Sequence, residues 1–485
     1  MLDGGLKMED LHGIWNGLYE EAIPKALKRL QNIPGVVIGF HSVVDGIKRV
    51  VPSQVRAVLG DPEVRGISLE HLRKMPEEIS TAADFIKGLL YTLHEGRSFR
   101  MVINEEGAFR WIMDRFGYDR LRLGGTSGCM ANALAPLGIR RILVYANPPT
   151  RALMDLFGRY DNLWVLASSG EGKTALRHPW EAGQQGGLRA LHWGFEFDEG
   201  TSIQLSGGVI SAPRSGRFYA CWNPVNNRLE ISEIFRQGIL EHIDSFSHMI
   251  VAGYQLLSPN YPDGSTCMDY IPRTVDFLTA LKRVKPDLHM HLELDTIPSR
   301  SIRKGVLDLV MPCVDSVGLN EVELDFLVRD LEGREVRSLG GSGEVTDYVR
   351  GMVFAMERVP IRRMHLHTDG CYLCLLRGGD SATAREALML AAAVAASRAK
   401  FGEIENLDFF DQIAEAPFSH EGLLQMKALM EGLGLSADFQ KTGLAVCGRY
   451  RLIFVPTKVI QEPTVTVGLG DTISAVGFLA GSADV

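Results

Sequence analysis

A glycine turn followed by a carboxylate lies near the C-terminus of this 485-residue chain, in the run Val467-Gly-Leu-Gly-Asp-Thr-Ile-Ser474. Glycines let backbone N–H groups approach an anion closely, and the residues after Asp471 have the pattern of the first turns of a helix, whose N-terminus favours negative charge. This combination predicts a phosphate site in which Asp471 accepts the proton of an acceptor hydroxyl while the amides stabilise the developing charge. The alternative is a strand-to-helix loop with Asp471 as the helix N-cap.

Two further polar clusters lie where predicted strands end. In the run His289-Met-His-Leu-Glu-Leu-Asp295, a period of two places the four polar groups on one face. They suit a solvated edge, a hydrogen-bonded network, a zinc site or a carboxylate that holds Mg²⁺ through water. The second cluster contains Asn320 and Glu323, which fit a capping box at a helix start. Glu323 would supply a second carboxylate for the same metal without losing the cap.

One motif only imitates a nucleotide site. The run Ala167-Ser-Ser-Gly-Glu-Gly-Lys-Thr174 resembles a phosphate loop with Ala in place of the first Gly. A phosphate loop continues directly into a helix, but Pro179 and Gly183 follow closely and oppose helix formation. We therefore expect no phosphate loop at this position.

Short apolar runs alternate with segments of helical periodicity along most of the chain. We expect strands at 35–40, 141–145, 163–166, 248–252, 288–294 and 315–319, and helices that include 275–284 and 321–331. This alternation predicts an α/β fold with a mostly parallel sheet covered by helices, and ligands at the carboxyl ends of the strands. Cys371 and Cys374 lie in an apolar run, so we expect packed thiols and not a metal or redox pair.

Two regions break the alternation and predict a second body. Residues 46–104 and 168–220 are richer in glycine, proline and alternating polar and apolar positions. We expect them to form antiparallel insertions that together make one lid, or substrate domain, over the site. The remaining ranges, 1–45, 105–167 and 221–485, then form the large nucleotide-binding domain.

The composition and charge of the chain argue against some classes of binding partner. Hydrophobic residues make up 46% of the chain and charged residues 23%, which is typical of a globular protein. The net charge is −8 and no dense block of Lys and Arg occurs, which argues against a nucleic-acid partner. The acidic N-terminal residues argue against a signal peptide, and the apolar run 388–396 is too short for a bilayer. We expect a cytoplasmic protein, a monomer or small homo-oligomer, that acts on small molecules without a membrane partner.

Taken together, the motifs resemble the ADP-dependent sugar kinases of archaea, the glucokinase and phosphofructokinase group of the ribokinase-like fold. The resemblance extends over nearly the whole chain, and the motifs occur in the family's order. They are Gly124-Gly-Thr-Ser-Gly-Cys-Met-Ala-Asn132, Arg214-Ser-Gly-Arg217, Gly253-Tyr-Gln-Leu256, His291-Leu-Glu293, Asn320-Glu-Val-Glu323, His365-Leu-His367, Val455-Pro-Thr-Lys458 and Gly468-Leu-Gly-Asp471.

The resemblance implies a role for each matching residue. It makes Asp471 the catalytic base and Gly468 to Gly470 the anion hole, in a transfer of the ADP β-phosphate to a hydroxyl that releases AMP. The other implied roles are Mg²⁺ organisation by Glu293, Glu323 and Asn320, contact with the ADP phosphates by Arg217, proximity to adenine for His367 and Val455, and acceptor binding by Asp45, Gly125, Thr126, His192 and Arg100.

The departures from the family pattern concern the acceptor. Glucose-using members carry Asn-x-Asn-x-Asp where this chain has His41-Ser-Val-Val-Asp45, and Thr126 replaces a Gln. Loss of these polar groups argues against free glucose, whereas the guanidinium of Arg100 suits a phosphate on the substrate. Fructose 6-phosphate and ribose 1-phosphate are therefore the favoured acceptors. The alternatives are an ADP-dependent glucokinase, an ATP-dependent ribokinase-like kinase for a sugar or nucleoside, and a non-catalytic nucleotide sensor.

Overall fold

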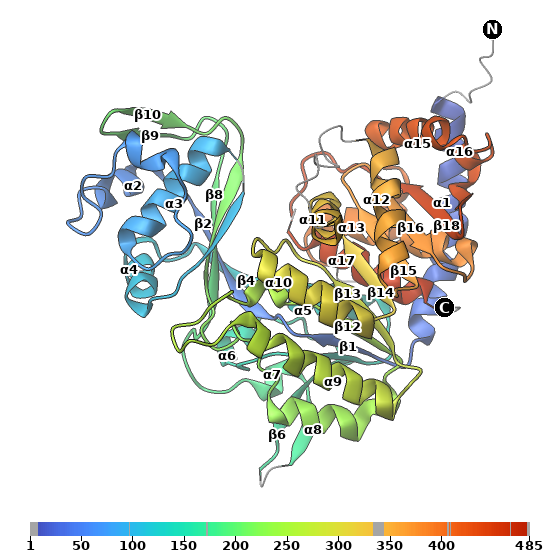
Figure 1. The fold of residues 1–485 in the computed structure, drawn as a ribbon, viewed down its shortest axis with the longest axis horizontal. Helices are drawn as coiled ribbons and strands as arrows, with labels where there is room; N and C mark the ends of the chain where they lie inside the picture. Colours follow the sequence, from blue (N-terminus) through green and yellow to red (C-terminus); the bar gives the residue numbers. More distant parts are fainter. Residues whose placement is uncertain are drawn as a thin grey trace.

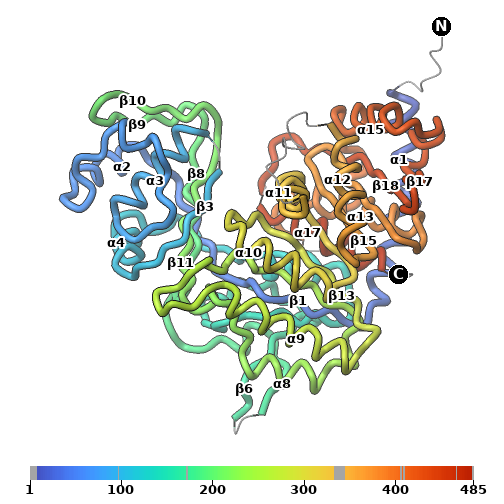
Figure 2. The backbone as a smooth tube through the Cα atoms, viewed as in Figure 1, coloured from blue at the N-terminus to red at the C-terminus, as the bar shows by residue number. Residues whose placement is uncertain are grey.

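The chain folds into two bodies, each built on its own sheet (Figure 1). The structure is a computed structural model that describes residues 8–96, 98–170, 173–332, 344–404, 407, 409–465 and 467–482. The tube in Figure 2 shows the smaller body, with α2, α3, α4 and β8, standing apart from the part that carries α12, α13 and α15. No helix in the described ranges combines the length and the apolar character needed to span a bilayer.

The large body contains an eleven-stranded sheet in the order β17-β18-β16-β15-β14-β13-β12-β1-β5-β6-β7. All neighbours from β15 to β6 pair in parallel, and the strands at the two ends pair antiparallel. The strands are β1 (Val36–Gly39), β5 (Ile142–Val144), β6 (Leu163–Ser168), β7 (Thr174–Arg177), β12 (His248–Val251), β13 (His289–Glu293), β14 (Ser316–Leu319), β15 (Arg363–His367), β16 (Cys371–Leu376), β17 (Leu444–Cys447) and β18 (Tyr450–Pro456). The predicted α/β class and its mostly parallel sheet are confirmed.

Helices flank this sheet because the parallel strands are apolar on both faces. They are α1 (Met8–Asn32), α5 (Thr126–Leu134), α6 (Arg151–Met154), α7 (Pro179–Ala182), α8 (Glu233–His242), α9 (Ile271–Val284), α10 (Arg300–Gly305), α11 (Glu321–Glu332), α12 (Val345–Arg358), α13 (Ser381–Phe401), α14 (Phe409–Ala414), α15 (His420–Leu433), α16 (Phe439–Thr442) and α17 (Leu469–Gly481). The apolar run 388–396 lies inside α13 and is buried in the core.

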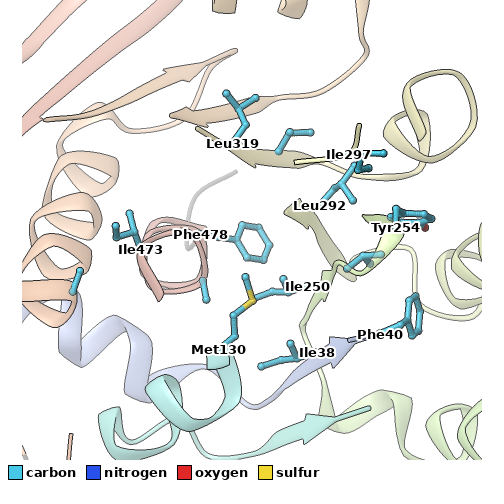
Figure 3. Close-up of a cluster of buried hydrophobic side chains, with 14 of the residues drawn as sticks. Ile38, Phe40, Met130, Ile250, Tyr254, Leu292, Ile297, Leu319, Ile473 and Phe478 are labelled. Atoms are coloured by element: carbon cyan, nitrogen blue, oxygen red, sulfur yellow. The ribbon is translucent and has the colours of Figure 1, made fainter. Parts of the chain in front are cut away.

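Helix α17 reaches the site from the core of the large body. From Thr472 to Gly481 every residue is buried, and the helix packs against α5, α13 and strands β13 to β15. Figure 3 shows Phe478 of α17 and Met130 of α5 directed toward Ile250 and Leu292 of the sheet. This packing fixes the helix, and with it the position of Asp471 in its first turn.

The smaller body contains a five-stranded sheet in the order β3-β11-β8-β2-β4 and a separate β9–β10 hairpin. Its elements are β2 (Val43–Arg49), α2 (Pro52–Val58), α3 (Ala82–Glu95), β3 (Phe99–Val102), α4 (Glu106–Phe116), β4 (Arg120–Gly124), β8 (Leu191–Phe197), β9 (Ser202–Leu205), β10 (Gly208–Ser211) and β11 (Gly216–Trp222). The sheet is mixed, because β2 with β8 and β3 with β11 pair in parallel. The expectation of purely antiparallel insertions is wrong for this sheet.

The sheets also locate two segments near the expected domain boundaries. Strand β4, within the range 105–167, pairs with β2 of the smaller sheet, whereas β7, within 168–220, pairs with β6 at the edge of the large sheet. We propose that the smaller body spans about 43–124 and 188–222, each boundary being set by the strand that crosses it.

The β6–β7 pairing also settles the imitation of a phosphate loop. Thr174 begins a strand that pairs antiparallel with β6, so a strand and not a helix directly follows the motif. Gly172, the second glycine of the motif, lies outside the described residues. The expectation that this motif is not a phosphate loop is confirmed by the strand.

Candidate active site

A cavity of about 1020 Å³ is lined by residues of both bodies. Strands β13, β14 and β15 each end at its wall, as the parallel topology predicts for a ligand site. The wall contains the predicted residues Asp45, Arg100, Gly125, Thr126, His192, Glu293, Asn320, Glu323, His367, Gly468, Gly470 and Asp471. We call the part with Gly468 to Asp471, Glu293 and Glu323 the transfer end, and the part with Asp45, Arg100 and His192 the acceptor end.

The transfer end is organised by the first turn of α17. Gly468 is the N-cap, with a φ of +73° that glycine adopts without strain, and no side chain caps the helix. Asp471 therefore does not act as the N-cap, and its carboxylate lines the cavity instead. The amides of the first helical turn have no acceptor within the helix, so they are available to an anion.

The environment of Asp471 gives it the character of a base. Burial, together with the charges of Asp295 and Asp45, raises its pKa from 3.8 to about 7, and the charge of Arg398 acts in the opposite direction. A carboxylate with a pKa near neutrality accepts a proton more readily than an ordinary aspartate does. This environment suits a base, and the catalytic role of Asp471 stays a prediction.

Glu323 serves both as a helix cap and as part of the cavity wall. Its Oε2 accepts a hydrogen bond from the backbone N–H of Asn320 at 2.8 Å, and Asn320 Oδ1 accepts one from the N–H of Glu323 at 3.0 Å. Its Oε1 accepts hydrogen bonds from Asn320 Nδ2 at 2.9 Å and from Thr296 Oγ1 at 3.1 Å. The predicted capping box is confirmed, and its carboxylate still faces the site.

Glu293 ends β13 and connects that strand to α17. It accepts a short hydrogen bond from Ser474 Oγ, one turn after Asp471, and Ser474 also contacts His291 Nε2 at 2.9 Å. The other ring nitrogen of His291 contacts Ser316 Oγ at 2.9 Å. Of the readings left open for 289–295, a hydrogen-bonded network and a cavity carboxylate therefore hold together, and the strand is not a solvated edge.

The residues present fit a metal ion held through water. Burial raises the pKa of Glu293 and of Glu323 well above the ordinary value, and the charge of neighbouring carboxylates adds to this. A divalent cation would relieve this concentration of desolvated negative charge. The oxygens of Glu323 are already hydrogen-bonded, and in the described ranges no three His, Cys, Asp or Glu side chains form a direct metal cluster. That argues against the zinc reading.

The acceptor end contains a guanidinium whose two hydrogen-bond contacts are to neutral side chains. Arg100 on β3 donates to Cys221 Sγ at 3.2 Å and contacts His192 Nδ1 at 3.4 Å. Burial raises the pKa of the Cys221 thiol, and burial, followed by the charge of Arg100, lowers the pKa of His192 well below its usual value. Both hydrogen-bond partners are therefore uncharged, and the carboxylates of Asp295 and Asp45 interact with the guanidinium only through their charge.

Asp45 has a different environment. Its carboxylate forms an ion pair with Arg122 at 3.5 Å across the β2–β4 pair. Burial nevertheless raises its pKa, with Arg122 and Arg100 acting in the opposite direction. Asp45 is thus a half-buried hydrogen-bond acceptor at the cavity wall, and its role in acceptor binding stays a prediction.

Two of the four connections between the bodies, the one before β2 and the one after β4, meet at the cavity. Gly125 has a φ of +77°, and a Cβ there would lie 2.5 Å from the carbonyl oxygen of His41. Two hydrogen bonds join the first turn of α5 to the segment before β2. Ser127 N donates to His41 O at 2.8 Å, and His41 N donates to Ser127 Oγ at 3.0 Å. Thr126 in turn donates to Asp295 Oδ2 at 3.1 Å.

The predicted nucleotide residues divide into two groups. His367 ends β15 in the cavity wall, and its Nε2 would lie 2.7 Å from a Cβ placed on Gly470. Val455 is fully buried in β18, outside the wall, and Arg217 forms an ion pair with Glu196 at 2.6 Å and also lies outside it. Their proposed contacts with ADP stay predictions.

Four residues of the site were not among the sequence candidates. Asp295 and Gln255 line the cavity and lie in motifs that the sequence does display. His41 lines it as well, in the position of a family Asn. Arg398 lies behind the glycine turn and has no sequence signal, because nothing in the sequence distinguishes it from Arg385 and Lys400, the other basic residues of its alanine-rich helix.

Comparisons with known proteins agree with this geometry. The profile of the "ADP-specific Phosphofructokinase/Glucokinase conserved region" matches residues 34–480. The chain is 28% identical over 480 residues to an ADP-specific phosphofructokinase of Methanosarcina acetivorans, covering 96% of both chains. It is 27% identical over 473 residues to an ADP-dependent glucose/glucosamine kinase of Pyrococcus furiosus, covering 96% of this chain and 98% of that protein.

A solved structure is similar over the same extent. An ADP-dependent kinase in complex with fructose-6-phosphate and ADPβS superimposes with a TM-score of 0.82 at 26% identity, covering 96% of this chain and 97% of the other. The similarity therefore includes both bodies and not only the large sheet.

Proposed function

Because this chain belongs to the ADP-specific phosphofructokinase/glucokinase family and is an ADP-dependent sugar kinase, we propose that its acceptor is a sugar phosphate. The observation that carries the proposal is the position of Arg100 in the cavity wall, with two uncharged contacts. A buried guanidinium binds a phosphate through charge-assisted hydrogen bonds, which a free sugar cannot provide. Fructose 6-phosphate and ribose 1-phosphate are the proposed substrates.

In the proposed reaction, the acceptor hydroxyl attacks the β-phosphorus of ADP and the bond from that phosphorus to the α-β bridging oxygen breaks. Asp471 takes the hydroxyl proton, and AMP leaves with the bridging oxygen. The first amides of α17 hold the charge on the transferred phosphoryl group. Asp45 and His192 orient the acceptor at the opposite end of the cavity.

Glu293, Glu323 and Asn320 would hold Mg²⁺ through water in this scheme. The ion would neutralise phosphate charge when bound. The chain's own part is to keep these groups in place, through the Glu323 cap on α11 and the contact of Glu293 with Ser474 on α17. The contact of Glu293 with Ser474 thereby joins β13 to α17, the helix that carries Asp471.

The proposal also explains the departures at residues 41–45. Val43 lies on β2 with 1% of its surface exposed, so it offers no polar group to a glucose hydroxyl. An unpaired buried hydroxyl costs roughly 1–3 kcal/mol, so the loss of two partners corresponds to about a hundredfold in kcat/KM. The alternative acceptor is glucose, because the chain is also similar to the ADP-dependent glucose/glucosamine kinase of Pyrococcus furiosus.

The test is a product analysis on the purified chain with Mg²⁺. AMP formation from ADP and ADP formation from ATP are measured with fructose 6-phosphate, ribose 1-phosphate and glucose as acceptors. We expect AMP from ADP, with kcat/KM for a sugar phosphate about a hundredfold above that for glucose. Equal efficiency with glucose would overturn the acceptor, and faster turnover of ATP would overturn the donor.

A further inference from the structure

Arg398 is a buried cation directly behind the glycine turn of the transfer end. It lies near the end of α13 with 6% of its surface exposed. Its Nη1 donates to the carbonyl oxygen of Gly468 at 2.8 Å and forms a short hydrogen bond to Thr472 Oγ1. Both acceptors are neutral, so these contacts leave the charge of the guanidinium uncompensated.

These contacts converge on one backbone carbonyl. Thr472 Oγ1 donates to Gly468 O at 2.7 Å, and the Thr472 amide donates to the same oxygen at 3.2 Å. On the other side of the turn, a Cβ on Gly468 would lie 3.1 Å from Cys129 Sγ of α5. The turn that begins α17 is therefore held between α13 and α5, with Arg398 as its charged contact.

Arg398 brings a positive charge to an end of the cavity where the other charged groups that interact with Asp471 are carboxylates. The titratable groups that act on Asp471 are Asp295, which follows β13, Asp45 on β2, and Arg398 on α13. Glu293 and Glu323 also interact with Asp471. Asp471 thus interacts with four other carboxylates, and Arg398 is a cation that acts on it in the opposite direction from behind the turn.

We propose that Arg398 is a positioning residue for phosphoryl transfer. Its guanidinium holds the Gly468 turn so that the first amides of α17 face the transferred phosphoryl group, and its charge offsets the surrounding carboxylates. The inference rests on the proposed function and adds a residue that does not line the cavity. It predicts that Arg398 acts on the transfer step more than on the binding of ADP.

The test compares Arg398→Met, which removes the charge and the hydrogen bonds, with Arg398→Lys, which keeps the charge. Lys400→Met is the matched control, because it removes an exposed cation from the same helix. Each variant is checked for folding by circular dichroism and measured for kcat, for KM of ADP and for the pH profile of kcat/KM.

We expect Arg398→Met to lower kcat by about 10²-fold, as loss of one stabilising donor does, with KM for ADP changed less than fivefold. Without the cation, the acid limb of the pH profile should move to higher pH, because Asp471 loses the neighbour that favours its charged form. Arg398→Lys should keep the limb near its wild-type position and lower kcat about tenfold. Lys400→Met should change neither quantity.

Three results would overturn the inference: a folded Arg398→Met with kcat within threefold of wild type, a loss of kcat with no movement of the acid limb, or wild-type kcat in Arg398→Lys. If Arg398→Met does not fold, the lysine variant decides alone. An inactive wild-type protein would instead contradict the proposed function, whereas an active wild type beside an equally active Arg398→Met would contradict only the role of Arg398.

Discussion

The two ends of the cavity are built differently. At the transfer end, Asp471, Glu293 and Ser474 are connected through α17, a helix buried from Thr472 onward in the core of the large body. At the acceptor end, Arg100 and His192 lie on strands β3 and β8 of a smaller sheet. Under the proposed function, the residues for transfer belong to the main core, and we expect acceptor choice to depend on a separate unit that can vary without disturbing that core.

Sequence matches follow the same division. The transfer end carries the family motifs without change, and the acceptor end is where this chain departs from them, at His41, Val43 and Thr126. Substitutions at the two ends should therefore affect different kinetic constants. The four predictions below test that separation, from the largest expected effect to the smallest.

Asp471→Asn should remove nearly all turnover and change ADP affinity by only a few-fold. The substitution deletes a base with a pKa of about 7 and preserves the shape of the side chain and the amides of α17. Loss of a positioned general base lowers kcat by about 10²- to 10⁴-fold. The measurements are steady-state kcat and calorimetric titration with ADP. A variant that keeps a tenth of wild-type kcat would show that another group is the base.

Arg100→Ala should raise KM for the sugar phosphate by roughly 10- to 100-fold, the value of a charge-assisted hydrogen bond, and leave KM for ADP unchanged. Arg110→Ala is the matched control, because that arginine is 71% exposed on α4 of the same body. Initial rates over a range of acceptor concentrations measure the effect. Equal changes in the KM values for sugar phosphate and for ADP would contradict separate roles for the two ends of the cavity.

Glu293→Gln and Glu323→Gln should each raise the Mg²⁺ concentration required for half-maximal activity, by several-fold for a metal held through water. Glu332→Gln is the control, because Glu332 is exposed at the far end of the helix that carries Glu323. Activity is measured over a Mg²⁺ titration at saturating ADP. Unchanged metal dependence in both variants would show that the two carboxylates have purely structural roles.

Asp471→Asn should also make the ligand-free protein more stable at pH 8. The pKa of Asp471 is raised from 3.8 to about 7, so the folded state holds its proton more tightly than the unfolded chain does. The native state therefore loses stability as pH rises from about 4 to about 7, by at most about 4 kcal/mol, and Asn avoids this loss. Thermal unfolding at pH 8 and pH 5 should show a larger gain in Tm at pH 8; an equal gain would contradict the raised pKa.

The sequence was sufficient where local pattern determines structure. Strands such as β1 and β12 are short apolar runs between polar segments, and the Asn320 and Glu323 cap is encoded within four residues. The position of Asp471 followed from the same kind of local information, a glycine turn before a helix. Each of these features requires only neighbours along the chain.

Pairing between distant segments was beyond the sequence. The assignment of β4 to the smaller sheet depends on its contact with β2, far away in sequence, and its residues carry no mark of that choice. The pairing of Arg217 with Glu196 across β11 and β8 is equally nonlocal and places the side chain outside the cavity wall. Arg398 is a third case, because its importance arises from packing α13 beside α17.

Two of the four crossings between the bodies, the one before β2 and the one after β4, are joined by hydrogen bonds between His41 and Ser127, and this has a mechanical consequence. Both crossings are also cavity wall, since His41, Gly125 and Thr126 line it. A rotation of one body on the other must therefore move groups that touch the ligands, and ligands that contact both bodies must bias that rotation. Binding and rotation are thermodynamically linked. An acceptor that favours one orientation of the two bodies must therefore bind more tightly to the protein in that orientation.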